Sequence, residues 1–340
     1  MKHFDTDYME GVHPVVMERL MATNLEQTPG YGNDRYCKEA KELIKKELGT
    51  EDVDVHFLVG GTQTNSTVID ALLMHHEGVV AAETAHINVH ESGAIESCGH
   101  KVITLPQHEG KIDAQELECY IKNFYADETY EHMTAPGMVY ISYPTEYGTL
   151  YSKAELEAIH SVCEEANIPL YIDGARLGYG LMSDACDIKF ADLPQLCDIF
   201  YIGGTKVGAM FGECVVAHKG LLKHFFPLIK QHGALMAKGR LLGIQFGTLF
   251  TDGLYFKIAR HAIELAMRLK AGFVEKGYRL FLDSPTNQQF FVLPNDVMDR
   301  LAKTATFEMW GARGEKETTV RFVTSWATKA EDVEELIREL

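Results

Sequence analysis

Short hydrophobic runs alternate with helical patterns along the first 250 residues of the chain. The runs predict strands, and the segments between them repeat apolar residues every three to four positions, as helices do. A mostly parallel sheet covered by helices on both faces has this alternation. The expected strands are 55–59, 78–82, 101–105, 138–142, 169–173, 199–202 and 213–217, and the expected helices begin near 14, 34, 64, 88 and 153.

The pattern changes after about residue 250, where strands and helices follow one another in a different order. A long helix over 253–276 leads to expected strands at 278–282, 289–293, 306–310 and 319–324, with helices after 295 and 328. This order indicates an α+β domain. We therefore expect an N-terminal arm over 1–13, a large α/β domain over 14–250 and a small domain over 251–340.

The composition of the chain argues against several kinds of partner and site. The net charge of −17 argues against a nucleic-acid backbone or an anionic membrane as partner, because both call for a basic face. The seven cysteines include no Cys-x-x-Cys pair, so we expect reduced, buried thiols with no disulfide and no metal site. No apolar run approaches the roughly 20 residues that span a bilayer, and we expect a cytoplasmic protein whose ligands are small molecules.

Two strand ends carry the most informative side chains. Asp173 ends one expected strand and is followed by Arg176, and Lys206 follows the next strand behind a Gly-Gly-Thr turn. A carboxylate stabilises a protonated pyridinium, and a lysine in an apolar pocket becomes a nucleophile, which are the needs of pyridoxal phosphate. Taken singly, Asp173 and Arg176 could form an ordinary ion pair, and Lys206 could be a solvated loop residue.

Further polar residues fall at neighbouring turns. The glycine turn Gly60-Gly61-Thr62 stands between a strand and a helix, where backbone N–H groups can hold a phosphate. His86 follows another strand end and can reach the same crevice, with His90 one turn later. Arg321 interrupts a buried strand and offers a planar fork for a carboxylate. Each also has a plainer explanation, as a structural turn, a hydrogen-bonded histidine or an edge-strand arginine.

Together these residues resemble the threonine aldolase branch of the aromatic amino-acid β-eliminating lyase family. These are pyridoxal-phosphate enzymes with the aspartate aminotransferase-like fold. The resemblance runs over nearly the whole chain, and Ile-Asp-Gly-Ala-Arg with the downstream lysine is its most specific part. It rests on the region of Asp7, Tyr31–Asp34, Gly60–Thr62, Glu83–His86, Ile172–Arg176, Lys206 and Val320–Arg321.

The resemblance implies a role for each cofactor contact. Lys206 would bind pyridoxal phosphate covalently, and Asp173 would pair with its ring nitrogen. Gly61 and Thr62 would hold the phosphate, and His86 would stack on the ring. Arg176 would contact the phenolic oxygen of the cofactor or the carboxylate of the substrate.

The resemblance also implies substrate contacts and an assembly. Arg321 would bind the substrate carboxylate, with Thr6 and Tyr31 as further contacts. Family members are homodimers or homotetramers with sites at the subunit interface. Tyr31, Lys230 and Lys238 could therefore act on a neighbouring subunit's cofactor.

One departure from the family concerns the acid or base. Many threonine aldolases have a Thr-His-Asn segment where this chain has Tyr143-Pro144-Thr145-Glu146. Thr145 takes the place of the usual histidine, so Glu146 or His86 becomes the candidate catalytic group.

The implied activity is cleavage of the Cα–Cβ bond of threonine, allo-threonine or a related β-hydroxy amino acid, giving glycine and an aldehyde. A β-eliminating lyase acting on another β-substituted amino acid is the nearest alternative. An aminotransferase and a non-catalytic binding protein on the same fold are more distant ones.

Overall fold

A seven-stranded sheet forms the centre of the molecule, and the computed structural model describes all residues 1–340. The strand order is β2-β8-β7-β6-β5-β3-β4, and only β8 runs antiparallel to its neighbours. The mostly parallel sheet predicted from the sequence is therefore confirmed. Its strands are β2 Val53–Leu58, β3 Glu77–Ala82, β4 Lys101–Leu105, β5 Ala135–Ser142, β6 Leu170–Asp173, β7 Ile199–Gly203 and β8 Glu213–His218.

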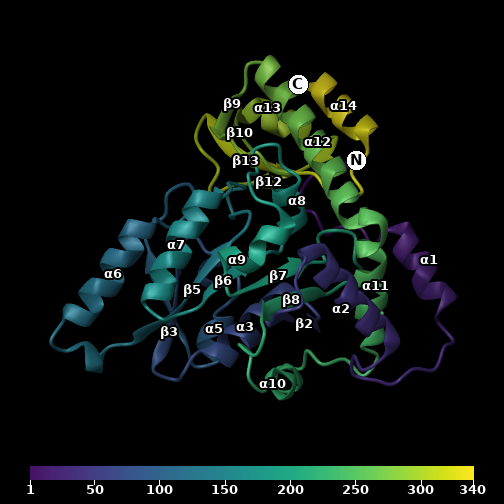
Figure 1. Ribbon diagram of the computed structural model, residues 1–340. Coiled ribbons are helices and arrows are strands. Elements are labelled where there is room, and N and C mark those ends of the chain that lie inside the picture. Colours follow the sequence, from purple (N-terminus) through teal and green to yellow (C-terminus); the bar gives the residue numbers. More distant parts are fainter.

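Helices surround this sheet and begin and end at recognisable caps (Figure 1). In α2, the Asp34 side chain accepts a hydrogen bond from the backbone N–H of Cys37 at 2.9 Å, and Gly49 ends the helix in the left-handed conformation. The helices are α1 Pro14–Ala22, α2 Arg35–Leu48, α3 Gly61–Leu72, α4 His86–Val89, α5 Ala94–Ser97, α6 Ala114–Ala126, α7 Lys153–Glu165, α8 Leu177–Leu181, α9 Leu193–Leu196, α10 Phe225–Gln231 and α11 Arg240–Phe250.

The C-terminal part forms a second, smaller layer above the sheet (Figure 1). Its antiparallel sheet has the order β12-β13-β10-β9, which agrees with the expected α+β character. The elements are α12 Leu254–Glu275, β9 Arg279–Leu282, β10 Gln288–Pro294, α13 Asn295–Leu301, β11 Ala305–Thr306, β12 Glu308–Met309, β13 Glu317–Val323 and α14 Ala330–Glu339.

The hydrophobic core has two parts that meet along α12. A cluster of 64 buried residues surrounds the large sheet and includes Tyr255 and Ile263 from the first half of α12. A cluster of 14 includes Leu269 and Phe273 from its second half. The long helix therefore joins the two packing units. No helix of the chain is long and apolar enough to cross a membrane.

The N-terminal arm lies against the small sheet rather than the large one. Strand β1, Lys2–His3, pairs in parallel with β11. Phe4 is fully buried in the smaller cluster, and its carbonyl accepts a hydrogen bond from the backbone N–H of Val323 at 2.8 Å. The arm is thus fastened to the small domain before it continues to the large one.

Several predicted details are wrong. Helix α3 begins at Gly61 and not at Thr64, and the helix expected over 88–97 is two short helices, because Ser92 and Gly93 have φ of 53° and 73°. The strand expected over 306–310 is divided between β11 and β12, which belong to different sheets. All seven cysteines are unpaired, but Cys119 is exposed, and Cys98 and Cys186 are only partly buried.

Candidate active site

A cavity of about 540 Å³ lies at the carboxyl edge of the large sheet. Strands β2, β3, β5, β6 and β7 all end at this edge, and β8 begins there. The cavity brings together most of the predicted site residues. It is lined by Tyr8, Gly61, Thr62, His86, His90, Glu91, Ser142, Thr145, Glu146, Asp173, Arg176, Lys206, Glu213, Gln288, Glu308, Trp310 and Arg321, among others.

Asp173 is a buried carboxylate held by several donors at the end of β6. Its Oδ2 accepts hydrogen bonds from the Tyr140 hydroxyl at 2.5 Å and from Asn65 Nδ2 at 3.0 Å, and its Oδ1 accepts from the Ala175 N–H at 2.9 Å. Burial by itself raises the pKa of Asp173, but the charge of His86 and these donors outweigh it, so the pKa lies below its usual value. Asp173 therefore stays ionised.

Lys206 reaches the same cavity from the turn after β7. Its Nζ has no hydrogen-bonding or ion-pair partner within the chain, and it lies 5.9 Å from the centre of the Tyr8 ring. Burial and the nearby charge of Arg176 lower its pKa. A lysine with a lowered pKa offers a larger fraction of neutral amine, which is the nucleophilic form.

The lysine turn is held by a second buried carboxyl group and by close backbone packing. Glu213, at the start of β8, accepts a hydrogen bond from the Gly204 N–H at 2.9 Å, and burial raises its pKa to about 8. A Cβ on Gly203 would lie 2.2 Å from the Ala175 carbonyl oxygen, and one on Gly174 would lie 1.9 Å from the Tyr201 carbonyl oxygen. Only glycine allows the turns that carry Asp173 and Lys206 to approach this closely.

The glycine turn opens helix α3 toward the cavity. Gly60 is the N-cap residue, so no side chain caps the first N–H groups of the helix. No atom lies within 4 Å of a Cβ built on Gly60, so the space beside the turn is open. Uncapped N–H groups and the Thr62 hydroxyl form an anion-binding arrangement.

His86 and Glu146 are linked to each other and to a buried acid. His86 Nδ1 lies 2.7 Å from Glu91 Oε1, and the His86 backbone N–H donates to Glu146 Oε1 at 2.9 Å. The Ser142 hydroxyl donates to the same Glu146 oxygen at 2.6 Å. Burial raises the pKa of Glu146, and the hydrogen bond from Ser142 opposes this only in part. Glu146 therefore keeps a proton to a higher pH than an exposed carboxyl group does.

The guanidinium of Arg176 is paired with the N-terminal arm. Its Nε and Nη2 donate to Asp7 Oδ2 and Oδ1 at 2.7 and 3.1 Å, and Asp7 is fully buried. The charge of Asp7 raises the pKa of Arg176 against the effect of burial. Asp7 therefore occupies the edge of the guanidinium that carries Nε and Nη2.

Arg321 reaches the cavity from β13. Its Nη1 donates to Gln288 Oε1 at 2.8 Å, and its Nη2 pairs with the half-exposed carboxylate of Glu308. The guanidinium also lies 5.2 Å from the centre of the Trp310 ring, and its Nε has no partner. Arg321 is thus a partly satisfied cation facing the cavity.

Other predicted residues do not line this cavity in a single chain. Thr6 is partly buried in the arm, and Tyr31, Lys230 and Lys238 are exposed. Lys230 Nζ lies 4.5 Å from the centre of the Tyr31 ring, so these two are neighbours of each other. Thr145 does line the cavity, and its hydroxyl shares a hydrogen bond of 2.6 Å with the Thr149 hydroxyl.

Residues that sequence reasoning missed complete the site. Asn65 Nδ2 donates both to Asp173 and, at 2.7 Å, to Glu91 Oε1. Its position four residues after Gly61 puts it on the same helix face as the glycine turn, a signal that was available in the sequence. Tyr8, Glu91 and Trp310 carried no such signal, because the fold alone brings them to the cavity.

The chemistry of these donors fits pyridoxal phosphate. An ionised, buried carboxylate suits a protonated ring nitrogen. An amine of lowered pKa without a partner suits covalent attachment, and an uncapped helix start suits a phosphate.

Comparisons with known proteins agree with this chemistry. The family model for beta-eliminating lyases matches residues 3–295. A low specificity L-threonine aldolase of Pseudomonas aeruginosa is 30% identical and is aligned over 100% of this chain and 97% of its own length. The structure of a Leishmania major threonine aldolase is 41% identical, with a TM-score of 0.96 over 99% of this chain and 98% of that one.

A more distant structure bears on the fold alone. An aspartate aminotransferase double mutant of Thermus thermophilus is 15% identical, with a TM-score of 0.71 over 99% of this chain and 90% of that one. Family and fold are those of pyridoxal-phosphate-dependent enzymes. By its full-length similarity to threonine aldolases and its match to the family model, this chain belongs to the beta-eliminating lyase family, in the threonine aldolase branch.

Proposed function

We propose that this protein is a pyridoxal-phosphate-dependent lyase that cleaves the Cα–Cβ bond of threonine, allo-threonine or related β-hydroxy amino acids, giving glycine and an aldehyde. One observation carries the proposal. An ionised Asp173 and a Lys206 of lowered pKa line the same cavity, at the edge where parallel strands end. Full-length similarity to proteins named threonine aldolases supports the choice of reaction.

The residues that would hold the cofactor follow from their chemistry. Lys206 would bind it covalently, Asp173 would hold the proton on its ring nitrogen, and His86 would stack on the ring. The start of α3, with Gly61 and Thr62, would hold the phosphate. When bound, the cofactor supplies an electron sink for the electrons released as the Cα–Cβ bond breaks.

The substrate is oriented by its carboxylate. Arg321 lines the cavity, and its Nη2 is paired with Glu308, a half-exposed side chain that a substrate carboxylate can replace. A guanidinium binds a carboxylate in a planar, directional pair, so this contact would fix which bond of Cα stands perpendicular to the ring. Trp310 lies over the same guanidinium and limits its movement.

Proton transfer from the β-hydroxyl needs a group that can take a proton in the cavity. Glu91 binds Nδ1 of His86, so Nε2 is the ring nitrogen left to exchange a proton with the substrate. Glu146 Oε1 is engaged by two donors, while its Oε2 is free, and its raised pKa suits proton exchange. We propose these two side chains as the acid and base, a role that contributes about 10²–10⁴ in rate.

We further propose that the working enzyme is a homodimer or homotetramer with sites completed across the interface. Tyr31, Lys230 and Lys238 are exposed and lie outside their own chain's cavity, which supports a role on a neighbouring subunit. Exposed apolar side chains on and before α1 support an interface there, because isolated chains rarely keep such groups together on the surface. They include Tyr8, Met9, Val15, Met17 and Met21.

The test combines a spectrum with product analysis. The purified protein with pyridoxal phosphate should absorb near the visible edge, and adding threonine should release glycine and acetaldehyde. Lys206→Ala should lose both the absorbance and the products, whereas Lys303→Ala, at an exposed position in the small domain, should keep them. Pyruvate and ammonia from a β-substituted alanine, without glycine from threonine, would favour β-elimination, and no absorbance would refute the cofactor.

A further inference from the structure

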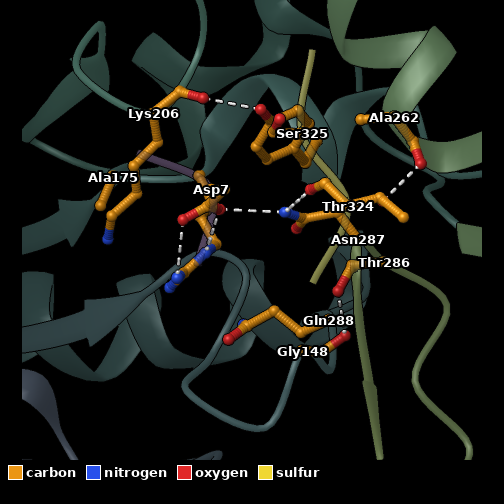
Figure 2. Close-up of polar contacts among 12 residues, drawn as sticks. Asp7, Gly148, Ala175, Lys206, Ala262, Thr286, Asn287, Gln288, Thr324 and Ser325 are labelled. Carbon is orange, nitrogen blue, oxygen red and sulfur yellow. Dashed lines mark hydrogen bonds and ion pairs between the residues drawn. The ribbon is translucent and has the colours of Figure 1, made fainter. Parts of the chain in front are cut away.

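Asp7 belongs to the N-terminal arm but is buried at the meeting point of both domains. It has no exposed surface, and its carboxylate binds the Arg176 guanidinium in two parallel hydrogen bonds. Figure 2 shows Asp7 between the Lys206 segment and the small-domain residues Asn287 and Thr324. Burying a carboxylate costs free energy of folding unless a cationic partner and further hydrogen bonds satisfy its oxygens.

Asn287 connects this pair to the small domain. Its Nδ2 donates to Asp7 Oδ2 at 2.9 Å and to the Thr324 carbonyl at 2.9 Å, so one amide group joins the carboxylate to the residue that follows β13 (Figure 2). The preceding residue, Thr286, donates to the carbonyl of Gly148 in the large domain at 3.0 Å. Arm, large domain and small domain are therefore tied together at one carboxylate.

We propose that Asp7, held by Asn287, is the positioning residue for Arg176 and aims its free N–H groups into the cavity. The inference rests on the proposed function. Because Nε and one hydrogen of Nη2 are bound to Asp7, the remaining donors are Nη1 and the outer hydrogen of Nη2. Arg176 lines the cavity, and a guanidinium fixed along one edge presents the other edge in a defined direction.

The same pair sets the charge next to Lys206. Arg176 lowers the pKa of Lys206, whereas Asp7 raises it, so the two charges largely oppose each other at the amine. Removing the charge of Asp7 would leave Arg176 uncompensated in a buried site. The protonated form of the Lys206 side-chain nitrogen, free or bound to the cofactor, would then be less stable.

The two parts of the proposal predict different effects in two variants. Asp7→Asn removes the charge, so the pH midpoint of the absorbance of the lysine-bound cofactor should fall by about one unit. It should also raise the KM for threonine, by about tenfold or more, because Arg176 loses its fixed direction. Asn287→Ala keeps the charge and loosens the carboxylate, so the KM should rise while the midpoint stays within a few tenths of a unit.

The matched control is Asp5→Asn. Asp5 lies on the same arm and accepts a hydrogen bond from the Thr306 hydroxyl, but it does not contact Arg176. This variant shows whether any disturbance of the arm produces the same effects. We expect it to leave both the pH midpoint of the absorbance and the KM unchanged. If Asp5→Asn shifts them as Asp7→Asn does, the positioning role is overturned.

A folded Asp7→Asn protein with the wild-type midpoint and KM would also overturn the inference. If that variant does not fold, Asn287→Ala decides alone, and an unchanged KM there refutes the positioning role. The proposed function is tested separately by the wild-type protein. A wild type without cofactor absorbance rejects that function, whereas a normal wild type with unaffected variants rejects only the role of Asp7.

Discussion

Replacing Gly203 by alanine should separate the two strand ends that carry the candidate active site. The added Cβ would lie 2.2 Å from the carbonyl oxygen of Ala175 and 2.6 Å from its carbonyl carbon. A carbon and a carbonyl oxygen normally approach to about 3.3 Å at the closest. The backbone after β7 must therefore move by roughly 1 Å from the backbone after β6.

The cost has two parts. Overpacking a buried position costs about 1–3 kcal/mol. The shift also stretches the 2.9 Å hydrogen bond from the Gly203 N–H to the Gly174 carbonyl, which contributes about 0.5–1.5 kcal/mol. Together these give a loss of about 1.5–4.5 kcal/mol in the free energy of unfolding. Since Asp173 and Lys206 move apart with the strands, kcat should fall by about 10².

Urea unfolding and steady-state cleavage of threonine measure the two effects. Gly247→Ala in α11 is the matched control, because its Cβ would meet Ala40 alone, with the Ala40 Cβ at an ordinary 3.6 Å. Alanine there should be neutral or stabilise by about 0.4–1 kcal/mol. If Gly203→Ala unfolds and reacts like the wild type, the close approach of the two turns is not what positions Asp173 and Lys206.

Three further outcomes are expected. Glu308→Gln should lower the KM for threonine by a factor of about 1.4 to 5 in steady-state kinetics, because a half-exposed ion pair with Arg321, worth about 0.2–1 kcal/mol, no longer competes with the substrate carboxylate. An unchanged or higher KM would contradict this. The Asp198 contact raises the pKa of His160, so the stability it contributes is present below pH about 6.5 and is lost as pH rises through the folded-state pKa. In urea unfolding, the free energy of unfolding of His160→Asn should therefore fall less between pH 6 and pH 8.5 than that of the wild type. Equal falls would show that the contact between His160 and Asp198 does not cause the pH dependence. Phe291→Ala removes a buried ring stacked on its neighbour at 3.9 Å and should cost about 3–5 kcal/mol in thermal or urea unfolding, whereas a cost below about 1 kcal/mol would show that the small core closes the gap.

The large sheet could be predicted because its strands are continuous apolar runs with turn residues at their ends. Asp173 and Lys206 could be placed at one edge for the same reason, since parallel strands end together. The break between α4 and α5 could not be predicted, because left-handed φ at Ser92 leaves no mark on hydrophobic periodicity. Strand periodicity likewise could not divide β11 from β12.

The contacts of the site were harder to predict than its residues. Asp7 and Arg176 lie 169 positions apart in the sequence, and no local pattern joins an arm to a strand end at that distance. Arg321 was expected to face a substrate, and only the fold reveals that Glu308 and Gln288 already bind it.

The pairing of β1 with β11 sets an order of events during synthesis. His3 leaves the ribosome 303 residues before Thr306, its partner in that pairing. At 5–20 residues per second, the arm waits about 15–60 seconds for its docking strand. A nascent chain that stops before β11 has Asp7 without the strand that anchors the arm. The first residues translated are therefore among the last to reach their native contacts, and the arm gains its pairing strand only after translation has passed β11.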